Sequence, residues 1–256
     1  MANHTFVQFG LSDRDYGLFV LEEFDIEAQL IAIRDFLRRN SKADKRVSER
    51  IAAYAEQMKS ATGDEEYFLD SLFVDECHGS VFQDAAHSLA AAGMLSPLIE
   101  GYFTVAFPNI AKQLDLFPRA IDGNIRSANS VVQYWDPHFV FGKKGTRKDI
   151  VGGIVQIAQS MGLSNALPND YQDVFNALFR YRNKVFHHGF EWPMDERKRF
   201  KKAVSDENWP ETWFTESLSG GEPWIIYMSQ EFIEKCLSTF ESCLEGVGSF
   251  LRLNSS

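Results

Sequence analysis

Three polar residues, Arg182, Asn183 and His187, interrupt an apolar and aromatic stretch of the sequence that runs from Tyr171 to Pro193. An arginine stays charged and binds phosphate through a planar fork of donors, whereas a histidine exchanges a proton near neutral pH. Together they suit cleavage of RNA by the ribose 2′-OH next to the scissile phosphate. In that reaction His187 moves the proton and Arg182 stabilises the charge that gathers on the phosphate. This chemistry needs no metal ion.

A helix from Asn169 to His188 is predicted to carry these residues. Asn169 or Asp170 is suited to the N-cap position, and Gly189, with Pro193 beyond it, ends the helix. One apolar stripe has the i, i+4, i+7, i+11 spacing of a helical face and comprises Phe175, Phe179, Arg182 and Phe186. A polar stripe with the same spacing lies beside it and comprises Asn176, Arg180, Asn183 and His187. Because an unpaired buried guanidinium is costly, Arg182 needs an acceptor or a solvated cleft.

The run Arg182-Asn183-Lys184-Val185-Phe186-His187 resembles the R-x4-6-H motif of the HEPN superfamily (higher eukaryotes and prokaryotes nucleotide-binding). Only the motif helix carries the likeness, and the remainder of the chain agrees in helix content alone. The resemblance implies a metal-independent endoribonuclease that acts as a homodimer, in toxin–antitoxin or phage-defence systems, with an antitoxin protein as partner. It also implies a positioning role for Asn183.

Two alternatives to catalysis remain open. Many HEPN-like proteins are non-catalytic, so the same cleft is also suited to a module that binds a nucleotide, RNA or a protein. In the plainest structural interpretation, Arg182 bonds a carboxylate while His187 and His188 cap the helix C-terminus as cations. An endoribonuclease requires Arg182 and His187 to be accessible and close together, whereas a structural role predicts that they are paired and occluded.

Further basic residues surround the motif. Between residues 180 and 202, eight basic residues stand against three acidic ones, a local balance of +5 in a chain of net charge −10. The candidates for binding RNA or phosphate are Arg180, Lys184, His188, Arg197, Lys198 and Arg199. A solvated helical face is the simpler interpretation of such a run. The acidic total argues against a protein that coats nucleic acid generally, but it allows a local basic cleft.

Composition sets the remaining limits. The chain has 256 residues, 45% hydrophobic residues and 22 Phe, enough for a sizeable core. Three cysteines, an odd number without a CxxC pair, indicate reduced thiols in the cytoplasm. We expect no signal peptide, because MANHTFVQFG lacks a basic region followed by an apolar core, and no membrane span. The group Cys77, His78, Asp84 and His87 fits no zinc spacing, so no metal or cofactor is predicted.

The fold class expected is mostly all-α: a single HEPN-like helical domain, residues 1–256, with extra helices and one small hairpin near 213–228. Residues 1–24 are expected to form an irregular arm with a short strand near 16–21, and residues 117–146 a long excursion without regular structure. Besides the motif helix, helices are predicted at 25–39, 47–60, 64–76, 80–93, 96–107 with a continuation to 116, 147–161, 194–204 and from 229 onward.

Overall fold

The computed structural model describes residues 10–21, 24–117, 134–142 and 145–254, and for residues 41–45 it describes the backbone alone. The chain divides into two compact units. The first unit comprises residues 1–27, 98–172 and 238–256, and the second comprises residues 28–97 and 173–237. The motif lies in the second unit.

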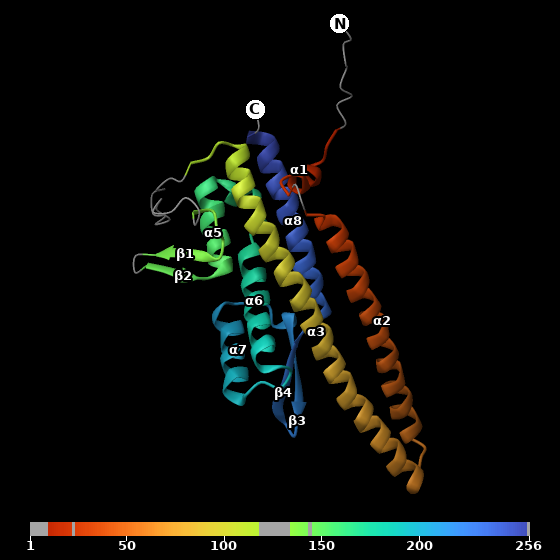
Figure 1. Ribbon diagram of the computed structural model, residues 1–256. Helices are drawn as coiled ribbons and strands as arrows, with labels where there is room; N and C mark the ends of the chain where they lie inside the picture. Colours follow the sequence, from red (N-terminus) through yellow and green to blue (C-terminus); the bar gives the residue numbers. More distant parts are fainter. Residues whose placement is uncertain (1–9, 22–23, 118–133, 143–144, 255–256) are drawn as a thin grey trace. The chain divides into compact units, whose positions relative to one another are not determined.

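Helices dominate the described chain and are joined by two small hairpins (Figure 1). In chain order the elements are α1 (Asp13–Phe19), α2 (Ile26–Met58), α3 (Asp64–Gln113), β1 (Phe139–Gly142), β2 (Gly145–Lys148), α5 (Ile150–Met161), η1 (Leu163–Ala166), α6 (Tyr171–His188), α7 (Met194–Asp206), η2 (Glu211–Trp213), β3 (Phe214–Ser219), β4 (Glu222–Met228) and α8 (Gln230–Asn254). The mostly all-α fold with a small hairpin at 213–228 is therefore confirmed.

Two helices are longer than the sequence analysis predicted. α2 joins the helices expected at 25–39 and 47–60, because residues 40–46 contain neither glycine nor proline. α3 joins three predicted helices and passes through Pro97 and Pro108, so the helix expected to begin at residue 96 is continuous with the one before it. The apolar residues around the two prolines are completely buried: Leu95, Ile99, Phe103, Phe107 and Ile110. Their burial outweighs the roughly 3 kcal/mol that a proline costs inside a helix.

The N-terminal prediction was wrong where the structure describes it. Residues 13–19 form helix α1 instead of an irregular arm with a strand, and a reciprocal capping box between Ser12 and Asp15 begins it. Gly17 and Gly248 bring the backbones of α1 and α8 into contact, since a Cβ on Gly248 would lie 1.6 Å from the Asp13 carbonyl oxygen. Residues 1–9 and 22–23, which belong to the expected arm, lie outside the described residues.

The expected excursion at 117–146 contains a second hairpin. β1 pairs antiparallel with β2, from Phe139 opposite Lys148 to Gly142 opposite Gly145. Strands of four residues carry too little alternation to be recognised between glycines and prolines. Residues 118–133 of the excursion lie outside the described residues. The predicted hairpin, β3–β4, turns at Gly220 and Gly221, which both have the positive φ that such tight turns require.

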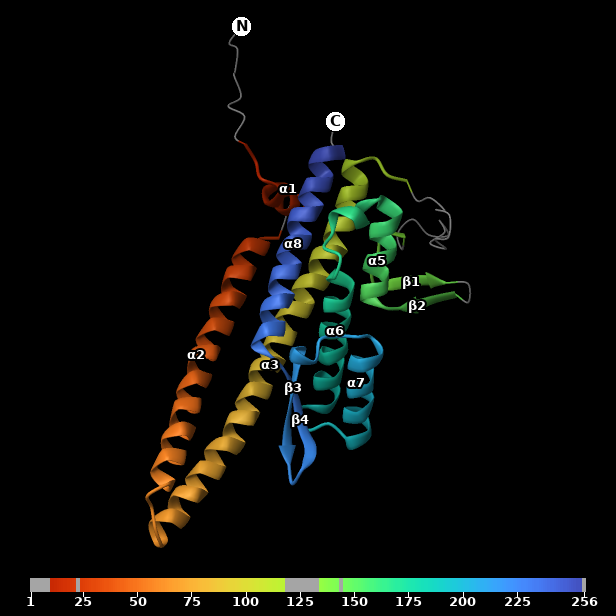
Figure 2. The ribbon, with the colours of Figure 1, turned by 180° about the vertical axis from the view of Figure 1, so that it is seen from behind.

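An aromatic cluster forms the core of the second unit. Tyr181 of α6 lies 5.7 Å from Trp192 and 6.2 Å from Phe200 of α7, measured between ring centroids. Phe200 contacts Phe214 of β3 edge to face at 4.8 Å, and Phe214 contacts Phe232 of α8 at 5.1 Å. The cluster fixes the β3–β4 hairpin beside α6 and α7, which are seen from behind in Figure 2.

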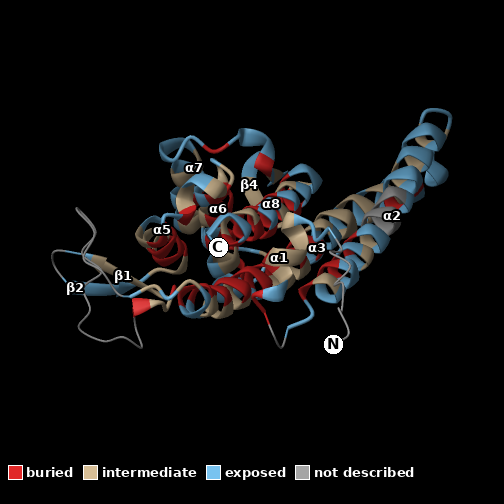
Figure 3. Ribbon diagram, turned by 90° about the horizontal axis from the view of Figure 1, so that it is seen from above, coloured by how far each residue is buried: buried red, intermediate tan, exposed pale blue. Residues whose placement is uncertain are grey.

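Exposure varies along the helices of the second unit. α2 and the N-terminal half of α3 run antiparallel, and the end of this pair near its connecting loop is largely exposed (Figure 3). Arg50 of α2 donates to Glu76 of α3 at 2.7 Å from Nε. Within the described chain, α3 alone is long and apolar enough to cross a membrane, which the sequence analysis did not anticipate. Half of its most apolar segment is buried, as in core helices of soluble proteins, so it is weak evidence either way.

Candidate functional site

Helix α6 has two distinct faces, as its spacing predicted. Its inward residues are buried: Val174, Phe175, Leu178, Phe179, Tyr181 and Val185. The Tyr181 hydroxyl donates to the Ile226 carbonyl of β4 at 3.4 Å. In the polar stripe, Arg180, Asn183 and His187 are exposed and Asn176 is half-buried. Phe186 departs from the prediction. It is 60% exposed, although Val185 beside it is buried.

The three motif residues occupy the last two turns of this helix. Arg182 is half-buried, and its Nε and Nη2 atoms each donate to Oδ1 of Asn183 at 3.2 Å. Its guanidinium carbon also lies 5.1 Å from the centroid of the Phe179 ring. The His187 imidazole is exposed, and no group in the described chain hydrogen-bonds to it. Gly189, with φ +70°, ends the helix immediately afterwards, as predicted.

Lys184 and Arg199 are both paired with Glu196. The Lys184 ammonium of α6 donates to Glu196 of α7, and Arg199 donates to the other carboxylate oxygen at 2.6 Å. The hydrogen bond from Lys184, with the charges of Lys184, Arg199 and His188, holds the pKa of Glu196 below its usual value. The contact of Lys184 with Glu196 joins α6 to α7, whereas Arg199 and Glu196 both belong to α7. An RNA phosphate would have to compete with Glu196 for both cations.

Arg197 is positioned as an anchor for β4. It is half-buried, and its Nη1 atom donates to the carbonyls of Pro223 and Trp224, the latter at 3.0 Å. The neighbouring Lys201 binds Glu216 at 2.9 Å. Of the candidate cations outside the motif itself, Arg180, Lys198 and His188 are exposed and are the most accessible. Arg180 lies over the Trp209 ring at 5.7 Å and is 3.8 Å from Glu207.

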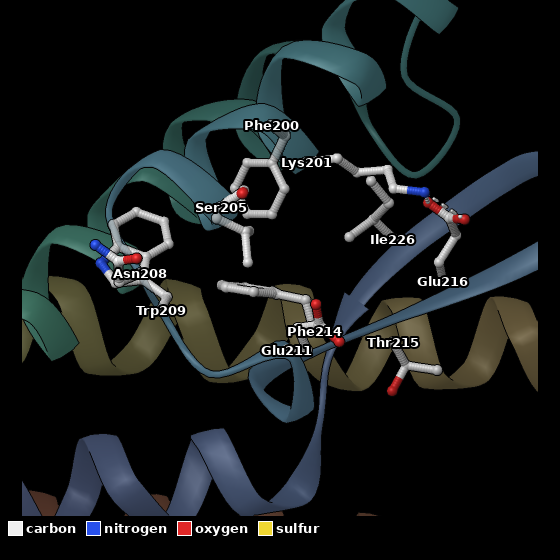
Figure 4. Close-up of a pocket in the computed structure, with 11 residues that line it drawn as sticks. Phe200, Lys201, Ser205, Asn208, Trp209, Glu211, Phe214, Thr215, Glu216 and Ile226 are labelled. Carbon is white, nitrogen blue, oxygen red and sulfur yellow. Dashed lines mark hydrogen bonds and ion pairs between the residues drawn. The ribbon is translucent and has the colours of Figure 1, made fainter.

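A pocket of about 580 Å³ in the second unit was not predicted from the sequence (Figure 4). We call it the α7–β3 pocket, and it is lined by Phe200, Lys201, Val204, Ser205, Asn208, Trp209, Glu211, Phe214, Thr215, Glu216 and Ile226. Trp209 is buried at one end of it. Asn208 has a left-handed backbone, φ +54°, which asparagine adopts more readily than most residues.

Comparison with protein-family models, with curated proteins and with solved structures finds no match for this chain. Among the described residues, no group of three His, Cys, Asp or Glu side chains is placed to hold a metal ion. The chemistry of the site therefore has to be argued from its own side chains.

Proposed function

We propose that the chain is a metal-independent endoribonuclease of HEPN type. The observation that carries the proposal is the accessible polar stripe at the end of α6, where the imidazole of His187 is exposed and both ring nitrogens are available to substrate. His187 takes the proton from the ribose 2′-OH and returns a proton to the leaving 5′ oxygen. The products are a 2′,3′-cyclic phosphate and a 5′-hydroxyl.

Arg182 and Asn183 serve the phosphate in this proposal. The Asn183 amide oxygen accepts two hydrogen bonds of 3.2 Å from the guanidinium, from Nε and Nη2, and so helps to fix its plane. In the proposed reaction the guanidinium binds the phosphate and stabilises its developing charge. Asn183 is thus a positioning residue, as the resemblance implied.

We further propose a cytoplasmic homodimer, in keeping with the resemblance to HEPN proteins. Phe186 supports it, because an aromatic side chain that is 60% exposed directly before His187 is suited to an interface beside the site. A role in a toxin–antitoxin or phage-defence system, with an antitoxin protein as partner, belongs to the same proposal and rests on the resemblance alone.

The second candidate function is a non-catalytic module that binds RNA, a nucleotide or a protein. The pairing of Lys184 and Arg199 with Glu196 favours it, because a site that must hold a polyanion is then poorer in available cations. Arg197, tied to two carbonyls of β4, reduces the available charge further.

The deciding experiment compares wild type with His187→Ala on labelled structured RNAs in EDTA, with analysis of the product ends. We expect cleavage with cyclic phosphate ends, reduced by about 10² to 10⁴-fold in the variant. His78→Ala, which removes an exposed histidine of α3 outside the site, is the matched control and should keep full activity. If no RNA is cleaved, or if His187→Ala cleaves as fast as wild type, the endoribonuclease proposal fails.

A further inference from the structure

The α7–β3 pocket has aromatic walls and a polar rim. Phe200 lines it from the α7 side and Phe214 from the β3 side, and Trp209 closes one end (Figure 4). Phe200 and Trp209 are buried, whereas Phe214 is half-buried. The rim carries the Asn208 amide and the Ser205 hydroxyl, while the ion pair of Lys201 and Glu216 lies at the opposite end. A volume of about 580 Å³ is in the range of small-molecule sites. The partly accessible Phe214 ring, with hydrogen-bonding groups at the edge of the pocket, suits a planar heteroaromatic ring.

Charge determines which part of a nucleotide can enter. The lining contains one cation, Lys201, against two carboxylates, Glu211 and Glu216, so the interior carries a net negative charge. A phosphate is repelled by such a lining. A neutral base that carries an exocyclic amino group donates hydrogen bonds to carboxylate and amide oxygens, as in recognition of adenine by Asn or of cytosine by Glu.

The pocket is connected to the motif through one side chain. Arg180 lies over Trp209, which forms the end wall, and Arg180 also belongs to the exposed stripe with Asn183 and His187. Seven residues of helix separate Arg180 from His187, about 10 Å along the axis. One nucleotide of an RNA strand spans about 3.4 Å or more, so a strand that follows this part of the helix crosses it in at most about three nucleotides.

We propose that the α7–β3 pocket binds an unpaired base carrying an exocyclic amino group, within about three nucleotides of the phosphate bound at Arg182. Arg180 holds the phosphate of that nucleotide outside the pocket, and the base packs against the half-buried Phe214 ring. This inference rests on the proposed function, because it requires RNA on the polar stripe of α6. It assigns to the enzyme a single-stranded substrate in which a base with an amino group is preferred over uracil at one position near the cleavage site.

A substitution at Asn208 can remove the proposed contact with the base without disturbing the fold. Its φ of +54° lies in the left-handed region, which glycine adopts without strain. Asn208→Gly therefore removes the amide while the backbone keeps its course. Ser205→Trp fills the pocket from an exposed position of α7 without removing a buried side chain. Its matched control is Ser71→Trp, at an exposed helical serine of α3 outside the pocket.

The first test measures binding by fluorescence anisotropy. Labelled eight-nucleotide 2′-O-methyl oligouridylates, which lack the attacking hydroxyl, carry a single adenosine at each position in turn. We expect one position at which adenosine lowers the Kd about tenfold relative to uridine. At the same position an abasic residue should raise the Kd by a similar factor. Ser205→Trp should abolish both effects and Ser71→Trp neither. Asn208→Gly should remove the preference for adenosine but keep the abasic loss.

The outcomes separate this inference from the ribonuclease. Suppose that cleavage depends on His187 but that no position of the oligonucleotide prefers adenosine, or that the preference persists in Ser205→Trp. The base-binding role of the pocket is then wrong, while the endoribonuclease proposal is still supported. Absence of both RNA binding and cleavage overturns both. The second test compares cleavage of oligouridylates containing one adenosine. Ser205→Trp should raise KM about tenfold with little change in kcat, and a loss confined to kcat contradicts a role in substrate binding.

Discussion

At the scale of single residues, the proposed catalysis depends on how Arg182 is held. A half-buried guanidinium over the Phe179 ring, bonded to the neighbouring amide, has a fixed plane. A lysine at that position keeps the charge but presents a single, strongly hydrated ammonium. We therefore expect the planar arrangement of donors on Arg182, and not its positive charge alone, to matter for catalysis.

This leads to a prediction for Arg182→Lys. We expect single-turnover cleavage of RNA to fall about 100-fold, because one of two donors to the transition-state phosphate is lost. The free energy of unfolding should change by less than about 0.5 kcal/mol. Arg39→Lys, at an exposed arginine of α2, should leave both quantities unchanged. Full activity in Arg182→Lys means that a point charge suffices, and the bidentate role is then wrong.

The sequence identified the motif residues and the two faces of α6, because type and spacing decide which side of a helix is apolar. It could not tell which cations were available. Glu196 binds Lys184 of α6, and two carbonyls of β4 bind Arg197, through the packing of α7 on its neighbours. These two pairings depend on tertiary contacts, whereas the pair of Arg199 with Glu196 has the i,i+3 spacing of a helix.

At the scale of elements, the two long helices were predicted in shorter pieces. Breaks were expected between residues 93 and 96 and near residue 107, yet α3 continues through Pro97 and Pro108 because the burial of the residues around them outweighs local preference. α2 continues through residues 40–46, which contain neither glycine nor proline. The β1–β2 hairpin was missed because its strands are short. Part of its support comes from His138, whose Nδ1 lies 2.7 Å from Asp136 Oδ1 and whose Nε2 lies 2.9 Å from Glu100 Oε1.

His138 should make the first unit sensitive to pH. Partial burial lowers its pKa, but the hydrogen bonds to Asp136 and Glu100 and their charges together raise it above the ordinary value. A raised pKa in the folded state means that the stabilisation is complete below about pH 6.5 and is lost as pH rises through the folded pKa. An NMR titration of the imidazole should show a midpoint above 6.5, which Glu100→Gln lowers. A midpoint at or below 6.5 in wild type contradicts this account.

At the scale of the whole molecule, the two compact units are not separate segments of chain. Their boundaries fall inside continuous helices: at residues 27/28 in α2, 97/98 in α3, 172/173 in α6 and 237/238 in α8. Breaking a helix at such a point would leave four backbone donors and four acceptors without intrahelical partners at the new ends. The sequence shows no linker at these points, which is why a single domain was predicted.

The cysteines report on whether the units unfold together. Cys236 lies in the second unit and Cys243 in the first; both are completely buried, and burial raises the pKa of each thiol well above its usual value. Cys77 is half-buried, and burial together with Glu76 raises its pKa more modestly. In native protein at pH 8 we expect iodoacetamide to modify Cys77 alone, and slowly, because only the thiolate reacts.

Along a urea series, mass spectrometry should find Cys236 and Cys243 alkylated at one shared midpoint, because the continuous helices couple the two units. The native sample is the control for accessibility, and fully denatured protein, in which all three thiols react, is the control for reactivity. Midpoints for Cys236 and Cys243 that differ by about 1 M urea or more mean that the helices break at the unit boundaries. The site on α6 would then belong to a unit that unfolds on its own.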